Sequence, residues 1–392
     1  MIQKSKKLFY VVEGINTFAV VYYSNYIFFY MKNEFGFGDF ENLLLAALNG
    51  FVYTIGSWQG GRFAQKFGNV KSIAVGICGI IVALLFGLTF SKLPAQLFAY
   101  IVYTFALCMI WPALEAIVSD ESDGCTLSTM VGVYNVTWAG TAAFAYFVTG
   151  YLLETLGMKS IYWLPVLIHA FQLGVILPLA VRAQNKEKIR IKKVVEVTTK
   201  DHAPPSYSKR FLHIAWVANP FSYIAISTIL PLIPSIAQKL GFSTALAGII
   251  CSIWMFARLI TFFTLWKWRG WHYHFRWLAV SFVTMVIGYT GMLLSGNCIQ
   301  LIDAQILFGV STGIIYYSSL YYSMHGSEEK GTHGGLHEAM IGSGLFVGPA
   351  FGAIYIFLVP STQNSGLPVN ALLIAGLCAI GWMGRFRLKS KK

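Results

Sequence analysis

Five ionisable side chains lie within long apolar stretches of this sequence, where charged groups are rare. They are Glu13, Glu115, Arg258, His337 and Glu338. An ionisable group inside a membrane span is disfavoured by at least about 2.5–3.5 kcal/mol, so one that is present usually faces a cavity or a partner. Two neighbouring carboxylates cannot both ionise cheaply, and one of them would hold a proton near neutral pH. The glutamates and the histidine are therefore candidates for reversible proton binding, and the arginine for binding an anion.

The composition is that of a membrane protein. The chain has 392 residues, of which 56% are hydrophobic and only 11% are charged, whereas soluble domains have roughly 25% charged residues. The sequence predicts twelve transmembrane helices, the first of them uncleaved because it lacks a small-residue cleavage site. These apolar segments are 8–30, 42–62, 70–90, 96–118, 129–153, 160–181, 211–238, 243–265, 276–295, 299–324, 333–358 and 367–385.

The lysines and arginines indicate how these spans are oriented. An N-terminus in the cytoplasm places 24 of the 29 in inner segments and only Lys32, Lys92, Lys159 and Lys239 in outer loops. Because short loops rich in lysine and arginine stay inside, both termini are predicted to be cytoplasmic. The net charge of +13 does not indicate nucleic-acid binding, since the cations lie between apolar runs rather than on one face or arm.

The longest polar segment divides the chain into two halves. We expect a bundle of six helices at 1–181, a basic cytoplasmic linker at 182–210, and a second six-helix bundle with a basic cytoplasmic tail at 211–392. The stretch NEFGFGDFENLLLAALNG of the first half resembles QKLGFSTALAGIICSIW of the second, and both follow the first helix of their half. Parallel repeats of this kind are typical of transporters. The predicted fold is thus all-α, with two pseudo-symmetric bundles.

The five ionisable residues form one layer of this predicted structure. At a helix rise of about 1.5 Å per residue, the three glutamates lie within about 10 Å of the cytoplasmic boundary and Arg258 lies about 12 Å from it. Glu13 and Glu115 belong to the first half and can approach each other, whereas Arg258 can reach Glu338 in the second half.

Each candidate also has a purely structural interpretation. Glu13 would hydrogen-bond within its own bundle, with Asn16 as a neighbour on the same helix face. Glu115 would reach water at the inner face. Arg258 would form an ion pair with Glu338. The histidine of helix eleven would pack in the protein interior.

A basic stretch between the second and third helices carries a known motif. In GGRFAQKFGNVKS, the residues Gly61, Gln65, Lys66 and Gly68 resemble the loop motif of the major facilitator superfamily, which has a glycine, an acidic–basic pair, a second glycine and further cations. TLWKWRGWHYHFR, between the eighth and ninth helices, resembles a degraded copy. With the twelve helices and the central linker, the resemblance covers the whole chain.

The resemblance implies a gating role for this motif. In the family, the motif's aspartate helps to latch the cytoplasmic side against the other half, but Gln65 stands in its place here, so we expect a weaker latch. Alternatively, the cations of the stretch anchor and orient the helices.

At the estimated midplane, aromatic and hydroxyl side chains replace the charged ones. In the family, helices one, four, seven and ten line a central cavity, flanked by two, five, eight and eleven. The resemblance therefore implies a site for a neutral or weakly charged organic molecule, although many of these rings would instead face lipid or fill helix interfaces. The candidates for substrate binding are Asn16, Tyr23, Trp138, Tyr223, Trp254, Arg258 and Tyr316.

The expected function is secondary transport of a small organic solute by alternating access between the halves, with the proton as coupling ion. We expect no cofactor besides a proton or other ion gradient, a small-molecule substrate, the lipid bilayer as surroundings, a functional monomer, and a bacterial-type inner or plasma membrane. An exporter of amphipathic drugs, a lipid-moving protein or a sensor on the same scaffold stays open.

An enzyme and a metal site are not expected. The sequence HEAM has Ile341 where a second histidine would complete a metalloprotease motif. The six cysteines form no CxxC pair, so that neither a disulfide framework nor a zinc site is indicated.

Overall fold

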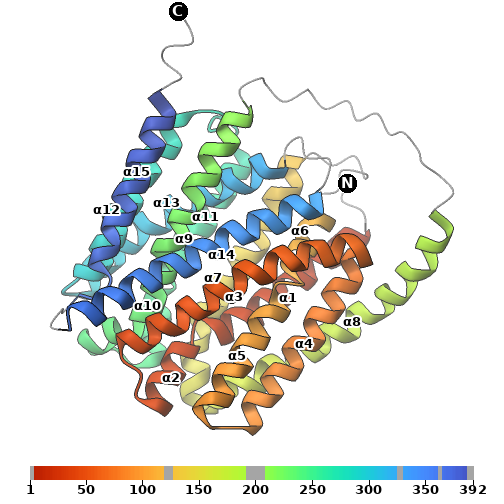
Figure 1. Ribbon diagram of the computed structural model, residues 1–392, viewed down its shortest axis with the longest axis horizontal. Coiled ribbons are helices and arrows are strands. Elements are labelled where there is room, and N and C mark those ends of the chain that lie inside the picture. Colours follow the sequence, from red (N-terminus) through yellow and green to blue (C-terminus); the bar gives the residue numbers. More distant parts are fainter. Residues whose placement is uncertain (1–3, 119–126, 191–207, 325–329, 361–363, 386–392) are drawn as a thin grey trace, which may run out of the picture.

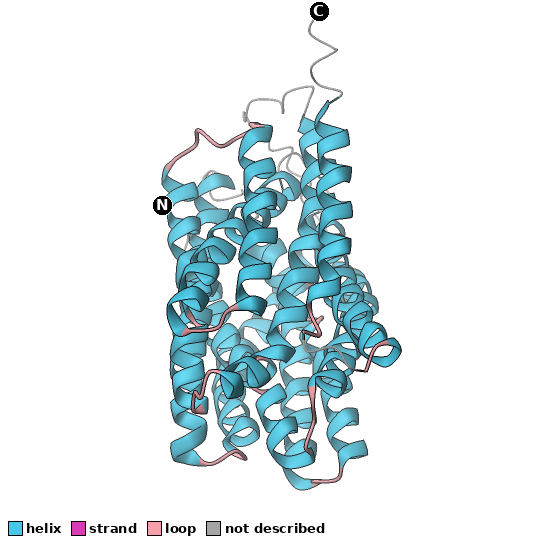
Figure 2. Cartoon of the chain, turned by 90° about the vertical axis from the view of Figure 1, so that its left-hand side faces the viewer, coloured by secondary structure: helices cyan, strands magenta, loops and turns pink. Residues whose placement is uncertain are grey.

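Nearly all of the described chain is helical. The computed structural model describes residues 4–118, 127–190, 208–324, 330–360 and 364–385, and no strand occurs in these ranges (Figure 2). This confirms the predicted all-α fold class. The elements are α1 (Lys4–Ser24), α2 (Ile27–Phe35), α3 (Asp39–Phe67), α4 (Asn69–Thr89), α5 (Leu93–Leu107), α6 (Trp111–Val118), α7 (Leu127–Leu156), α8 (Ser160–Arg190), α9 (Ser208–Lys239), α10 (Thr244–Cys251), α11 (Ile253–Lys267), α12 (Phe275–Leu294), α13 (Cys298–Met324), α14 (Lys330–Leu358), the 3₁₀ helix η1 (Leu367–Val369) and α15 (Asn370–Arg385).

Ten helical segments in the described ranges are long and apolar enough to cross a membrane. They match the predicted spans from 70–90 onward. The first two predicted spans coincide with α1–α2 and with α3, which are more polar. Their polar side chains Glu13, Asn16 and Asn42 are buried in the protein interior, so these helices can carry them without exposing them to lipid.

Three of the predicted helices are each built from two shorter ones. The chain breaks between α1 and α2, between α5 and α6, and between α10 and α11. At the second break, the N–H groups of Met109 and Ile110 donate to carbonyls three residues back, at 3.1 and 3.0 Å. Such tight turns interrupt the α-helical ladder, and Pro112 has no N–H with which to continue it. Each of these three predicted spans therefore contains a break in its helix.

The two bundles meet along a pair of helices from opposite halves. α3 and α14 run side by side across the middle of the molecule (Figure 1), and α7 contacts α10 and α11. A Cβ atom added to Gly50 would lie 2.2 Å from the backbone carbon of Leu345, and one added to Gly150 would lie 2.2 Å from the carbonyl oxygen of Thr244. Glycine therefore lets the backbones of the two halves approach closely.

The described ends of the predicted linker are helical. α8 continues to Arg190 and α9 begins at Ser208, while residues 191–207 lie outside the described ranges. The division of the chain at 1–181, 182–210 and 211–392 stays a prediction.

The basic motif lies mostly inside a helix rather than in a loop. α3 extends to Phe67, beyond the predicted end at 62, because the motif residues before Gly68 continue the helix. Gly68 ends it with φ of 94°, in the left-handed region that favours glycine. Gln65 and Lys66 are exposed. A Cβ atom on Gly335 of α14 would lie 3.1 Å from Cα of Gly61, so this end of α3 touches the other half.

Candidate functional site

A cavity of about 220 Å³ lies between the two halves. Helices from both halves line it: α1, α2, α3, α5, α6 and α7 on one side, α9, α11, α13 and α14 on the other. Its wall combines aromatic rings, a few amides and hydroxyls, and three ionisable groups, which is the character of a small-molecule site. The predicted site residues on this wall are Glu13, Trp138, Tyr223, Trp254, Arg258, Tyr316 and Glu338.

The carboxyl group of Glu338 links the two halves beside this cavity. Its Oε2 accepts a hydrogen bond from the hydroxyl of Tyr53, which lies on α3 of the first half. Its Oε1 lies 3.7 Å from Nδ1 of His337, the preceding residue on α14. Tyr53 and Glu338 both line the cavity, so the linkage stands next to the space a solute would occupy.

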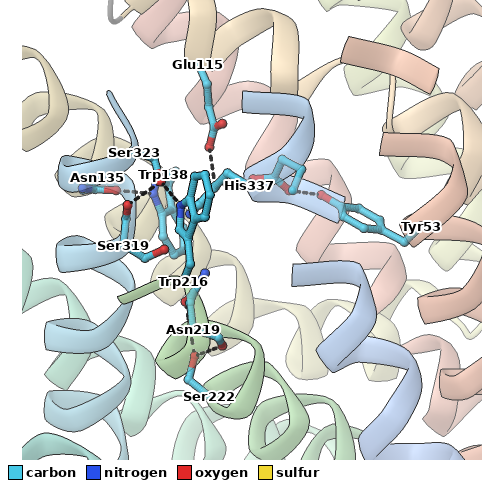
Figure 3. Close-up of polar contacts among 11 residues, drawn as sticks. Tyr53, Glu115, Asn135, Trp138, Trp216, Asn219, Ser222, Ser319, Ser323 and His337 are labelled. Carbon is cyan, nitrogen blue, oxygen red and sulfur yellow. Dashed lines mark hydrogen bonds and ion pairs between the residues drawn. The ribbon is translucent and has the colours of Figure 1, made fainter. Parts of the chain in front are cut away.

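A second carboxyl group approaches the same histidine from the first half. Oε1 of Glu115, on α6, lies 3.9 Å from Nδ1 of His337. Figure 3 shows the Glu115 side chain pointing toward His337, with Tyr53 on the far side of the histidine. The side chains of Glu115, His337 and Glu338 are all buried. Each position was predicted from its type within an apolar helix, and the structure brings the three together.

Glu13 adds a second carboxyl group to the wall, besides that of Glu338. Thr17, one turn further along α1, donates a hydrogen bond to its Oε1 at 3.0 Å. Glu13 interacts electrostatically with both Glu338 and Glu115. The predicted approach of Glu13 to Glu115 stays a prediction.

Arg258 does not pair with Glu338 as the structural interpretation expected. Among the described residues, the ion pairs of Glu338 within 4.0 Å do not include Arg258. Instead, the guanidinium carbon of Arg258 lies 4.9 Å from the ring centroid of Tyr316 and 5.0 Å from that of Trp138. The arginine sits on α11, whose neighbours at this depth are rings rather than carboxylates, and cation–π contacts surround it.

Two predicted residues lie away from the cavity wall. Tyr23 is fully buried, and its ring centroid is 4.4 Å from that of Tyr103 within a group of tyrosines. Asn16 is fully buried as well, and within the described part of the chain neither polar atom of its amide has a hydrogen-bond partner. Neither residue is among the described residues that line the cavity.

The family model of the Major Facilitator Superfamily matches this chain over residues 10–349. The chain belongs to this superfamily. The solved structure of the nucleoside transporter NupG is similar, with a TM-score of 0.70 and 14% identity, over 97% of this chain and 99% of that one. The human organic anion transporter MFSD10 is similar with a TM-score of 0.67 and 12% identity, over 96% of this chain and 100% of that one. At such identities the likeness shows the fold alone. None of the curated proteins matches the sequence.

The major facilitator fold places the cavity between the two helical bundles of a membrane protein. The chain is an integral, multi-pass membrane protein with the fold of a secondary transporter, and the cavity lies where its two bundles face each other. Family and fold point to a transporter rather than an enzyme.

The buried cluster also has the donors that a metal ion would need. One ligand atom each from Glu115, His337 and Glu338 lies within 4.8 Å of the others. Carboxylate oxygen and imidazole nitrogen suit several divalent ions. The same three groups can therefore bind either protons or a cation, and the two alternatives differ in their response to a chelator.

Tyr53 is the main residue of this site that is not among the predicted site residues, although it lies among the aromatic side chains at the estimated midplane. Its partner Glu338 is 285 positions away along the chain, and nothing in the local pattern of either segment pairs them. A tyrosine inside a polar, buried helix such as α3 was the available signal, but the chain has 21 tyrosines.

Proposed function

We propose that this protein is a proton-coupled secondary transporter that carries a small organic solute by alternating access. One observation carries the proposal: the carboxyl groups of Glu13, Glu115 and Glu338 come from both halves and lie in or beside the central cavity. Carboxyl groups held close together between membrane helices are a typical means by which transporters relay protons. A site whose protonation changes the contact between the halves can couple proton movement to the transport cycle.

The proposal includes the arrangement in the membrane. The excess of lysine and arginine in the expected inner segments supports cytoplasmic termini. Because the cavity is built from one chain, the protein should work as a monomer. A bacterial-type inner or plasma membrane fits a carrier driven by a proton gradient.

Proton coupling is tested in proteoliposomes with a pH-sensitive dye inside. Pools of sugars, nucleosides, amino acids, organic acids and cationic amphiphiles are added in turn, and internal pH is followed. At least one pool should move protons with the wild type, whereas Glu13→Gln should abolish that movement and leave solute exchange intact. Gln retains the hydrogen-bond acceptor for Thr17 but cannot release a proton.

The matched control is Glu34→Gln, which removes an exposed carboxylate at the end of α2. It should behave as the wild type. If Glu13→Gln keeps the proton signal, Glu13 is not the carrier. Silence of the folded wild type with every pool would instead favour uniport, another coupling ion, or a lipid-moving or sensory role.

Removal of metal ions shows whether the buried cluster of Glu115, His337 and Glu338 binds protons or a metal ion. If Glu115, His337 and Glu338 act through protons, treating both faces of the vesicle with a chelator should leave the solute-dependent proton signal unchanged. Loss of the signal, with recovery on adding one divalent ion, would show that the cluster binds a metal ion instead.

A further inference from the structure

Arg258 is a buried cation, and one edge of its guanidinium group lacks partners. The residue is 2% exposed, and Nε and Nη2, which form this edge, have no hydrogen-bond partner among the described residues, although the side chain does interact with Tyr223. Buried charges are normally paired and hydrogen-bonded, because leaving water is costly for an ion. An arginine in this condition therefore indicates a partner that the protein itself does not provide.

The surroundings of Arg258 are mainly aromatic rings. Four ring centroids lie around the guanidinium carbon, at 4.9 Å for Tyr316, 5.0 Å for Trp138, 5.4 Å for Phe262 and 5.9 Å for Tyr223. Cation–π contacts are made over ring faces and use no N–H donor. The N–H groups lie in the guanidinium plane, in a fork that matches a carboxylate.

Three of these rings come from both halves and belong to the cavity wall. Trp138 lies on α7 of the first half, whereas Tyr223 and Tyr316 lie on α9 and α13 of the second. With Arg258 itself, all three line the cavity. The indole nitrogen of Trp138 donates to Asn135 at 3.0 Å, which fixes its ring. A planar group in the cavity would thus meet aromatic rings from both halves, next to Arg258.

We infer that the transported solute is an organic anion with an aromatic ring, whose carboxylate binds the free edge of Arg258. This rests on the proposed transport function and names its substrate class. Two charge-assisted hydrogen bonds would satisfy the buried guanidinium, and the ring of the solute would lie among Trp138, Tyr223 and Tyr316. The carboxylate of the substrate is then the partner of the buried guanidinium group.

Binding to the purified full chain in detergent tests this inference without a membrane or a proton gradient. Isothermal titration calorimetry compares phenylacetate and naphthylacetate with their amides and with phenethylamine. The carboxylates should bind about tenfold or more tightly than the amides, the factor expected for lost charge-assisted hydrogen bonds. Equal or tighter binding of the amides, or no binding of any carboxylate by folded protein, would overturn the inference.

Substitutions of Arg258 test whether the carboxylate of the solute binds this residue. Arg258→Gln should remove the preference for carboxylate over amide, and Arg258→Lys should keep part of it because the charge remains without the fork. Arg276→Gln is the matched control, because Arg276 also lies over a ring, that of Trp277, but is exposed outside the cavity. If Arg258→Gln keeps the full preference, the anion binds elsewhere.

The outcomes also separate this inference from the proposed function. Carboxylate binding without solute-dependent proton movement would support the anion site and contradict proton coupling. Proton movement driven by a neutral solute, without carboxylate binding, would support transport and contradict the anion site.

Discussion

Glu338→Gln should abolish accumulation of solute against its gradient while leaving exchange across the membrane intact. Gln cannot bind or release a proton, so the link between the halves would stay neutral throughout the cycle. Its side-chain oxygen can still accept the hydroxyl of Tyr53, and the repulsion between two carboxylates next to His337 disappears. We expect proton-driven uptake to fall by at least about tenfold, corresponding to about 1.4 kcal/mol of lost coupling. Uptake and counterflow in the same proteoliposomes measure the two activities.

Two companion variants show whether the proton or the hydrogen bond matters. Tyr53→Phe removes the donor and keeps the carboxyl group, so it should weaken uptake less than Glu338→Gln does. Asp303→Asn neutralises an exposed acid of the same half, on α13, and should have no effect. Full uptake by Glu338→Gln, with normal dependence on the pH gradient, would exclude Glu338 from coupling.

Most of the fold could be predicted because lipid imposes a simple length rule. The predicted spans from 70–90 onward match helices that are long and apolar enough to cross a membrane. The breaks next to Met109 and Ser252 could not be predicted, since a broken helix is as apolar as a continuous one. The extension of α3 through the motif was missed for a related reason: polar residues end an apolar run, but they do not end a helix.

The site was predicted by residue type and not by contact. Glu115, His337 and Glu338 stood out because ionisable groups are costly in lipid, and the same cost explains why they lie together in the interior. The partner of Arg258 was predicted wrongly, because depth alone made Glu338 available to it, whereas side-chain packing placed rings there. Tyr53 carries no such cost, so nothing distinguished it from the other tyrosines at the midplane. The free-energy cost of burying a charge thus identifies the ionisable residues of the site from the sequence. The uncharged residues of the site are identified only once the packing of the two halves is known.

Gly50→Ala should nearly stop transport, although it adds a single methyl group. The added Cβ would lie 2.2 Å from the backbone carbon of Leu345 and 2.2 Å from the backbone nitrogen of Phe346, far inside van der Waals contact. Backbone atoms cannot move aside as a flexible side chain can, so α3 and α14 would have to separate. Overpacking of this kind costs about 1–3 kcal/mol, and even 1–2 kcal/mol corresponds to a factor of about 5–30 in an equilibrium.

This cost falls on the contact between the halves, which every transport cycle must form and break. Turnover of Gly50→Ala in proteoliposomes should therefore fall by about tenfold or more, and the purified protein should unfold at a lower temperature than the wild type. Gly174→Ala, on α8, is the matched control: its Cβ would meet no atom within 4 Å, and alanine favours a helix over glycine. Equal turnover and equal melting temperature for the two variants would mean that the close approach of α3 and α14 at Gly50 does not belong to the working cycle.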